Sequence, residues 1–417
     1  MLDPISQEVR YCSPYHGGWD IARMALSVPE SHAVFFCPAS CARIIALNAK
    51  KNGLQPRLSV YGLREDEIVM NDYRDAVVSS VGELMERLPQ RPKVLMLFVS
   101  CIDSMLATDH SGELRDLEKL YPDVRFMLMR MDPICQSAKR RQTIFKLHED
   151  IFSLLEPCTR DPRLVALTGG NDWPRDGFFT EHLRKNGLSV THVGLCRTME
   201  EFQQMAGAAL NVCTMPFGSD AVKMLEKKCG TPFVMLTQKA DLDLFESDYR
   251  RICEALQIPP PDMAALRSEA VSAMERAAKK LNGLPVFVDS AAFNDPVSWG
   301  LLLKRHGLNV KKVFVYSPAA AETPEARALC EAYPDVEVRD CGRCDMADDR
   351  AVEPCDAVAV GQECGCFTGA KYTVPLFCDN GHWGWDAVVN VCRLIENAPQ
   401  SAISTAALTE EAKLCAE

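Results

Sequence analysis

Short apolar runs alternate along residues 1–160 with longer segments whose apolar side chains recur at helical spacing. The run KVLMLFV at 93–99 is almost wholly apolar, which is typical of a parallel strand covered on both faces. The segment 75–88 places Val77, Val81 and Leu84 on one side, which predicts an amphipathic helix. The same reasoning predicts strands at 33–36, 57–61 and 124–129, and helices at 20–29, 114–120 and 138–155. This alternation predicts an α/β fold with a parallel sheet and right-handed crossovers.

The alternation begins again twice, each time with a new apolar run. The first restart is a strand predicted at 164–168, which ends in a pair of glycines that suits a domain start. Helices predicted at 242–256 and 263–281 end this part as a long arm, and the second restart follows at 284–289. A helix predicted at 385–396 closes the last repeat. We therefore predict three α/β domains and a tail, at 1–160, 161–282, 283–398 and 399–417.

The composition places the chain among ordinary globular proteins, because 47% of its residues are apolar and 25% are charged. The net charge of −11 comes without a stripe of Lys and Arg, so nucleic acid is not an expected partner. No apolar run reaches the roughly 18 residues of a membrane span. The N-terminus MLDPISQEVR lacks the pattern of a signal peptide. We therefore expect a cytoplasmic protein that does not enter a membrane.

The 19 cysteines are the unusual feature of the composition. In a reducing compartment they do not form a disulfide framework, and most of them are expected to be small core residues. Ligands of open α/β sheets bind beyond the carboxyl ends of the strands. Four cysteines from the three predicted domains follow predicted strands at such positions: Cys41, Cys101, Cys213 and Cys378. Soft thiolates favour iron–sulfur clusters or zinc.

Our main hypothesis is that Cys12, Cys41 and Cys101 converge at one edge of a sheet and bind an iron–sulfur cluster. Cys37, four residues before Cys41, is a weaker candidate. Three thiolates are one short of the set that holds a cubane cluster, so a second subunit or a different ligand must complete the site. The alternative is three buried cysteines at strand ends. The spacing alone leaves both interpretations open.

Other residues offer weaker candidate sites. Cys341 and Cys344 have the C-x2-C spacing of a zinc or redox pair, and Cys364 and Cys366 form a second close pair. The competing interpretation is that these thiols bind nothing. Three polar side chains near the motifs are candidates for proton transfer or ligation: His382, Asp103 and Asp109. The competing interpretation is packing for the histidine and helix capping for the aspartates.

The motifs, taken in order, resemble those of the component 1 family of nitrogenase and nitrogenase-like reductases. That family has a Cys, then a His-Gly-Pro-x-Gly-Cys turn, then a Cys before an Ile-Gly-Asp-Asp-like run. This chain offers Cys12, the run Phe36-Cys-Pro-Ala-Ser-Cys41, and the run from Cys101 to Asp109. Later matches, which extend the resemblance over residues 8–396, are Leu210-Asn-Val, Gly230-Thr-Pro-Phe and Gly381-His-Trp-Gly-Trp-Asp386.

The resemblance implies three Rossmann-like domains with parallel sheets around a shallow central cavity. It implies pairing with a homologous second subunit, or with a second copy of this chain. Cys12, Cys41 and Cys101 would then be this subunit's share of a bridging 4Fe-4S cluster at the interface. It also implies that an ATP-dependent iron protein donates the electrons and that this chain itself binds no nucleotide.

Departures from the family pattern reduce the range of reactions expected of this chain. The His-Gly-Pro of the turn is Phe-Cys-Pro at 36–38, and the family's cofactor-binding histidine falls near Asn380, two residues from His382. Cys213 lies close to the position of the family's cofactor cysteine, which makes it a weaker candidate ligand. These departures argue against the reduction of dinitrogen.

The leading hypothesis is a subunit of a nitrogenase-like oxidoreductase that carries out ATP-linked, multi-electron reduction of a small molecule or a tetrapyrrole. The alternative is a scaffold or carrier for metal-cluster or cofactor assembly. A third interpretation is a binding protein without redox chemistry that kept the fold, with its thiols empty or holding zinc.

Overall fold

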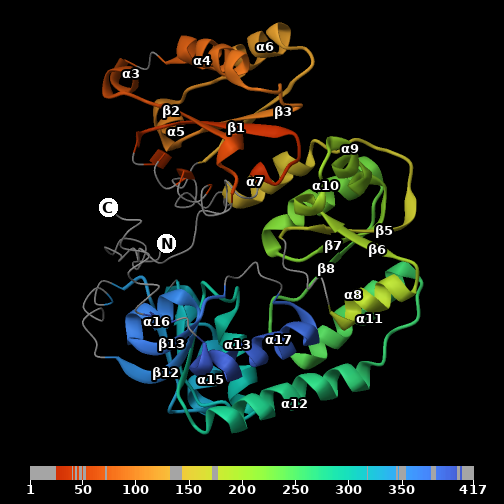
Figure 1. Ribbon diagram of the computed structural model, residues 1–417, viewed down its shortest axis with the longest axis vertical. Helices are drawn as coiled ribbons and strands as arrows, with labels where there is room; N and C mark the ends of the chain where they lie inside the picture. Colours follow the sequence, from red (N-terminus) through yellow and green to blue (C-terminus); the bar gives the residue numbers. More distant parts are fainter. Residues whose placement is uncertain are drawn as a thin grey trace. The chain divides into compact units, whose positions relative to one another are not determined.

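A computed structural model of the chain shows three sheets of parallel strands (Figure 1). It describes residues 25–39, 41–42, 45–46, 49, 53–70, 73–131, 143–170, 177–316, 318–343, 346, 354–376, 382–401 and 404–405. Every strand-to-strand pairing within the three sheets of this described part is parallel. The predicted α/β fold with parallel sheets is therefore confirmed. No helix among the described residues is long and apolar enough to cross a lipid bilayer.

The described residues form two compact units. The first unit runs to Gly169 and includes Leu188–Met235 as well, so that it contains two of the three sheets. The second unit contains the third sheet, the described part of Gly170–Gly187, and the described chain from Leu236 onward. The division into three domains, with boundaries after residues 160 and 282, stays a prediction.

Sheet A, in the first unit, is covered by helices on both faces. One face packs against α4 (Arg74–Arg87) and α6 (Ser111–Leu120), and the other packs against α7 (Thr143–Phe152) (Figure 1). This double cover explains why β1 and β3 are buried at every position. In spatial order the strands are β2 (Leu58–Gly62), β1 (Ser31–Cys37), β3 (Val94–Val99) and β4 (Arg125–Arg130). Each lies within two residues of a predicted strand.

Sheet B belongs to the same unit and shares part of its core with sheet A. Ala166 of sheet B and Leu225 of α10 lie in one apolar cluster with the residues that pack α7 against sheet A. Lys93, just before β3, forms an ion pair of 2.8 Å with Glu200 of α9. In spatial order the strands are β6 (Ser189–His192), β5 (Asp161–Thr168), β7 (Ala208–Cys213) and β8 (Phe233–Met235). The helices beside them are α9 (Met199–Gln204) and α10 (Ser219–Cys229).

Sheet C is the five-stranded sheet of the second unit. Its strand order reverses between β9 and β12, so that the crevice expected at such a switch point lies beyond the ends of these two strands. In spatial order the strands are β11 (Glu337–Asp340), β10 (Val310–Val315), β9 (Val286–Asp289), β12 (Cys355–Val360) and β13 (Ala370–Val374). The helices between them are α13 (Pro296–Arg305), α14 (Pro318–Ala321), α15 (Pro324–Ala332) and α16 (Gln362–Thr368).

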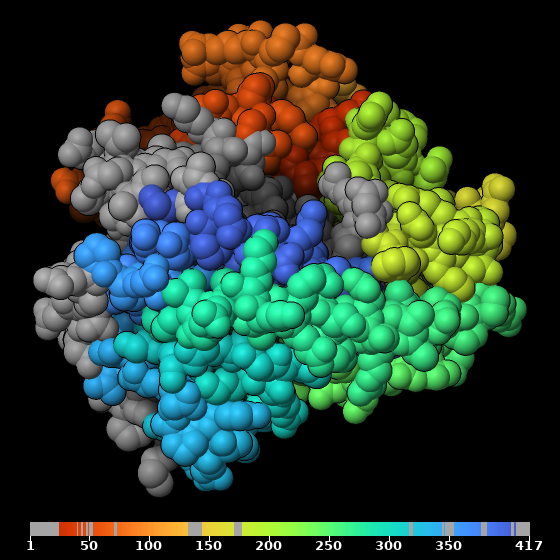
Figure 2. Space-filling model, turned by 60° about the horizontal axis from the view of Figure 1, so that its bottom comes forward, coloured from red at the N-terminus to blue at the C-terminus, as the bar shows by residue number. Residues whose placement is uncertain are grey.

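The two helices predicted as a long arm are present with the predicted bounds, α11 (Leu242–Leu256) and α12 (Met263–Leu281). However, α12 does not stand apart from its unit. It packs along α17 (Gly384–Asn397), and buried alanines such as Ala273 allow the two helices to approach closely. The other side of α12 lies at the surface of the unit (Figure 2).

The run Gly381–Asp386 joins three helices of the second unit through its last four residues. Trp383 Nε1 donates to Asp248 of α11 at 3.3 Å, and the backbone N–H of Trp385 donates to the Tyr249 hydroxyl at 3.0 Å. Asp386 accepts from the backbone N–H of Phe179, in α8 (Phe178–Lys185), at 3.2 Å. The described part of this motif therefore has a structural role in packing α8 and α11 against the start of α17.

Candidate metal centre

The two described cysteines of the main hypothesis leave sheet A at the same edge. In the parallel pairing of β1 with β3, Phe36 lies opposite Val99, one residue before β1 ends and at the last residue of β3. Cys41 follows four residues after the end of β1, and Cys101 follows two residues after the end of β3. Both thiols are half-buried. The carboxyl edge of two neighbouring strands therefore carries two half-buried soft donors. Ligands of such sheets bind at this edge.

Cys37 and Cys41 have different surroundings although only four residues separate them. Cys37 is the last residue of β1, is fully buried, and belongs to the core on the α7 side of sheet A. Burial, with a smaller contribution from Cys41, raises the pKa of the Cys37 thiol to about 12. Metal binding requires the thiolate. The environment of Cys37 therefore opposes ligation. Cys41 instead ends a turn that begins at Pro38, and its N–H donates to the Pro38 carbonyl at 3.0 Å.

Cys101 is the first residue of α5 (Cys101–Leu106), a short helix that follows β3 directly. The Ser100 hydroxyl caps this helix by accepting from the N–H of Ile102 at 3.3 Å. Ala107, with a φ of 52°, ends it in the left-handed conformation. Helical spacing puts Met105 on the same side as Cys101, and Met105 is 69% exposed. The Cys101 side of α5 therefore faces outward from the unit.

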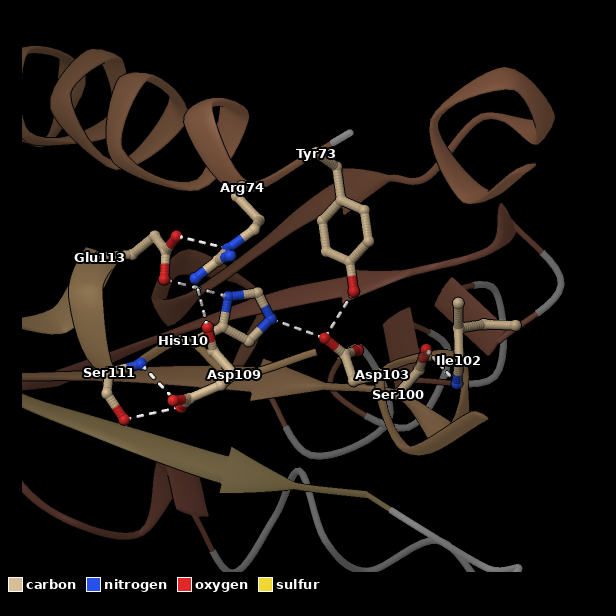
Figure 3. Close-up of polar contacts among 9 residues, drawn as sticks. All are labelled: Tyr73, Arg74, Ser100, Ile102, Asp103, Asp109, His110, Ser111 and Glu113. Carbon is tan, nitrogen blue, oxygen red and sulfur yellow. Dashed lines mark hydrogen bonds and ion pairs between the residues drawn. The ribbon is translucent and has the colours of Figure 1, made fainter. Parts of the chain in front are cut away.

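Asp103 lies on the opposite side of α5 and is fully buried. Figure 3 shows its carboxylate between the side chains of Tyr73 and His110, which directly precede α4 and α6. Asp103 Oδ1 accepts from the Tyr73 hydroxyl at 2.5 Å and from His110 Nε2 at 2.6 Å. Because a carboxylate oxygen can only accept, His110 Nε2 carries the hydrogen of this bond. Burial and the hydrogen bond to Asp103 raise the pKa of Tyr73 well above its usual range.

The network continues from His110 to the surface (Figure 3). His110 Nδ1 lies 3.8 Å from Glu113 Oε2, and the other oxygen of Glu113 accepts from Arg74 Nε at 2.9 Å. Arg74 is half-exposed and also donates to the carbonyl of Asp109 at 2.8 Å. A chain of polar contacts thus connects the buried side of α5 with the surface of the unit.

Asp109 has a local role at the start of α6. Its Oδ1 accepts from the backbone N–H of Ser111 at 3.0 Å and from the Ser111 hydroxyl at 2.6 Å. These two bonds, the hydroxyl bond first, lower the pKa of Asp109. This geometry is that of an Asx turn directly before α6, whose N-cap residue is His110.

Sequence reasoning missed the partners of Asp103. Tyr73 precedes Asp103 by 30 residues, and only the fold of the unit brings the two together. His110 directly follows the run from Cys101 to Asp109, which placed it near the candidate site in sequence. Nothing in the pattern, however, distinguishes it from a residue that merely flanks a helix. Glu113 looks like an ordinary acidic residue in a first helical turn.

The remaining thiol candidates lie elsewhere. Cys213 ends β7 in sheet B, where its thiol donates to the Met215 carbonyl at 3.1 Å and burial raises its pKa to about 12. Cys341 lies in the core of sheet C and donates to the Val315 carbonyl at 3.1 Å. Burial raises the pKa of the Cys341 thiol far above its usual range.

Several predicted site residues lie in other settings or are not described. His382 lies edge-on against Phe293, with ring centroids 5.5 Å apart. Cys364 is fully buried and Cys366 is half-buried, both in α16. Three cysteines that the sequence analysis singled out fall outside the described residues: Cys12, Cys344 and Cys378.

The donor chemistry at the edge of sheet A fits an iron–sulfur cluster. Cys41 and Cys101 are soft, accessible donors, and the neighbouring Asp103 faces the interior and does not compete with them. Among the described residues no three His, Cys, Asp or Glu side chains are grouped so as to hold a metal ion. Because Cys12 is not described, the expected set of three thiols stays a prediction.

Comparison with solved structures gives the same architecture. "Nitrogenase Cp1 at pH 6.5" has a TM-score of 0.67 at 14% identity, with 94% of this chain and 92% of that chain covered. "Nitrogenase Cp1 at pH 5" has a TM-score of 0.61 at 13% identity, covering 95% and 89%. At these identities the likeness shows the fold. A comparison with curated proteins gives no match.

Comparison with protein families identifies the family as well as the fold. The family described as "Nitrogenase component 1 type Oxidoreductase" matches residues 14–397, nearly the whole chain. The chain belongs to this family, and the resemblance found in its motifs is confirmed. It is therefore a subunit of the nitrogenase-like oxidoreductase type.

Proposed function

We propose that this chain holds an iron–sulfur cluster through Cys12, Cys41 and Cys101 and uses it in ATP-linked, multi-electron reduction of a small molecule or a tetrapyrrole. The observation that carries the proposal is the exit of Cys41 and Cys101 from neighbouring strands at one sheet edge, with both thiols accessible. Members of the family typically bind metal–sulfur clusters. A 4Fe-4S cluster supplies one-electron transfer when it is bound.

The residues of this chain hold and orient the site. The Pro38 turn presents Cys41, and the Ser100 cap starts α5 so that Cys101 leaves the sheet directly after β3. Asp103 holds the inner side of the same helix in the core. These contacts fix the two described ligand positions before any metal binds, which lowers the cost of assembling the site.

The exposed side of α5 supports a shared site. Met105 is 69% exposed on the Cys101 side. Elsewhere in the same unit, Val69 and Met70 are 80% and 73% exposed. We propose that a partner subunit covers this side of α5, where Met105 is exposed in the single chain. A homologous second subunit, or a second copy of this chain, would complete the ligand set that three thiolates leave one short.

The electron donor in this proposal is an ATP-dependent iron protein, which binds the nucleotide itself. Family members work in multi-subunit complexes with such a partner. We place the protein in the cytoplasm, with neither a membrane nor nucleic acid among its partners. We do not propose dinitrogen as the substrate. Cys213 is buried, and its thiol donates a hydrogen bond to a backbone carbonyl, so it is not positioned to bind a cofactor.

A scaffold or carrier for cluster assembly is the second candidate function. The observation that favours it is the partial exposure of Cys41 and Cys101, since partly exposed ligands release a cluster more readily than fully buried ones. Loading the purified complex with ⁵⁷Fe and mixing it with an apo-ferredoxin separates the two functions. An oxidoreductase keeps its ⁵⁷Fe after donor-driven reduction and reoxidation. Transfer of most of the ⁵⁷Fe to the ferredoxin would instead establish the scaffold and contradict the main proposal.

A further inference from the structure

The short helix α5 cannot set its own orientation. It has six residues, fewer than two turns, and isolated helices of this length are not stable in water. Its rotation about its own axis must therefore come from contacts with its surroundings. This rotation decides where the Cys101 thiol points, because successive side chains of an α-helix are separated by about 100°.

Asp103 is the only buried residue of α5, and Leu106, which is partly buried, packs against the neighbouring core. At helical spacing its side chain points about 200° away from that of Cys101, whereas Met105 lies only about 40° from Cys101. The burial agrees with this geometry, since Asp103 is fully buried and Met105 is 69% exposed. Holding Asp103 inward therefore turns Cys101 outward.

Two helices of sheet A hold Asp103 through one oxygen. The Tyr73 hydroxyl, at the start of α4, and His110 Nε2, at the start of α6, both bond to Oδ1. Both helices are anchored in the core, α4 by residues such as Val81 and α6 by Leu117. The second oxygen, Oδ2, is buried and has no hydrogen-bond partner in the structure. The position of the carboxylate therefore depends on these two donors.

We propose that Tyr73 and His110 are positioning residues that lock the rotation of α5 and so direct the Cys101 thiol toward the candidate cluster. They act on Asp103 and not on the metal. The role of the two residues in directing Cys101 toward a cluster rests on the proposed function. The restraint on the rotation of α5 does not depend on metal, and it is measurable in the metal-free chain.

The first test is hydrogen–deuterium exchange of the metal-free chain over peptides that contain α5. The variants Tyr73→Phe and His110→Leu each remove one donor to Asp103. We expect α5 to exchange about tenfold faster in either variant, which corresponds to ~1.4 kcal/mol of lost local stability. His110→Gln retains an N–H donor near the position of Nε2 and should restore most of the protection. Tyr121→Phe, which removes a hydroxyl at the far end of α6, is the matched control and should leave α5 unchanged.

The second test is the EPR spectrum of the cluster in the complex purified without oxygen. Tyr73→Phe and His110→Leu should shift the g values or broaden the signal, and His110→Gln should resemble the wild type. Urea unfolding of each variant shows that the unit is still folded.

If α5 exchanges in both variants as fast as it does in Tyr121→Phe, Tyr73 and His110 do not restrain the rotation of α5. If exchange changes but the EPR signal of an iron-loaded wild type does not, the two residues do not position Cys101. A wild type without any cluster contradicts the proposed function. The exchange result still shows whether Tyr73 and His110 restrain α5.

Discussion

Asp289 gives a sharp test of the energetics of sheet C. It is the last residue of β9 and is fully buried. Its two oxygens accept from the backbone N–H groups of Ala292, at 2.9 Å, and Cys364, at 2.7 Å. The turn at Gly361 packs so closely that a Cβ there would lie 1.9 Å from the carboxylate. Burial raises the pKa of Asp289 from its ordinary value of 3.8 to about 6.

The direction in which stability changes with pH follows from the pKa of Asp289 in the folded and the unfolded state. The unfolded chain releases the proton near pH 3.8 and the folded chain near pH 6, so the folded state binds more protons between these values. Stability due to this group is therefore lost as the pH rises through that window, and the loss is complete above it. A pKa moved from 3.8 to about 6 corresponds to about 3 kcal/mol. About 2 kcal/mol of this falls between about pH 4.5 and 7.5.

The wild-type pH profile alone does not isolate this effect. Burial lowers the pKa of His32 to about 4 and that of His148 to about 3, and these shifts act in the opposite direction, since they destabilise the fold as the pH falls below 6.5. Comparison with Asp289→Asn cancels them. The asparagine keeps the shape of the side chain and removes the titration, so its own cost does not vary with pH.

The assay is urea unfolding of both proteins across this pH range, followed by tryptophan fluorescence. Trp299, Trp383 and Trp385 all lie in the second unit with Asp289, so the fluorescence reports on the relevant part. The wild type should lose about 2 kcal/mol relative to Asp289→Asn between about pH 4.5 and 7.5. Two parallel pH profiles would contradict this prediction, because they would mean that Asp289 has the same pKa in the folded and the unfolded state.

Two further substitutions test the packing and the choice of ligands. Gly384→Ala should destabilise the second unit by about 3 kcal/mol in urea unfolding, since φ is +83° and a Cβ would lie 2.2 Å from the Tyr249 hydroxyl. Gly187→Ala is its control, because φ is +75° there with nothing within 4 Å, and a loss as large as that of Gly384→Ala would show that the clash is unimportant. Cys37→Ala should cost about 1–2 kcal/mol of stability and leave the iron content unchanged, because Cys37 is a core residue. Iron lost in Cys37→Ala but kept in Cys41→Ala would reverse the ligand assignment.

Periodicity predicted the main elements well because it follows directly from burial. The bounds of α11 and α12 were predicted from their apolar spacing, and the doubly covered strands of sheet A from their continuous apolar runs. The helix α5 was missed, since CIDSML is too short to show a period and ends at Ala107, a non-glycine residue in the left-handed conformation. The common edge of Cys41 and Cys101 was expected because parallel strands share one carboxyl edge.

Tertiary contacts between distant residues were not predictable from local pattern. The Asp386–Phe179 bond spans 207 residues and brings α8 into the second unit, although β5 and β6 on either side of it in sequence belong to the first. The Tyr73–Asp103 bond likewise depends on how α4 and α5 pack over sheet A. No periodicity encodes such pairs, so the role of Asp103 emerged only from the fold.

Cluster binding by this chain is tested most directly by its iron and acid-labile sulfide content when it is purified without oxygen together with its partner subunit. We expect both elements in the wild type with a cluster EPR signal, their loss in Cys101→Ala, and their retention in Cys330→Ala, which removes a half-buried thiol from α15. A wild type without iron and sulfide, or a Cys101→Ala variant that retains both and the same signal, would contradict this expectation.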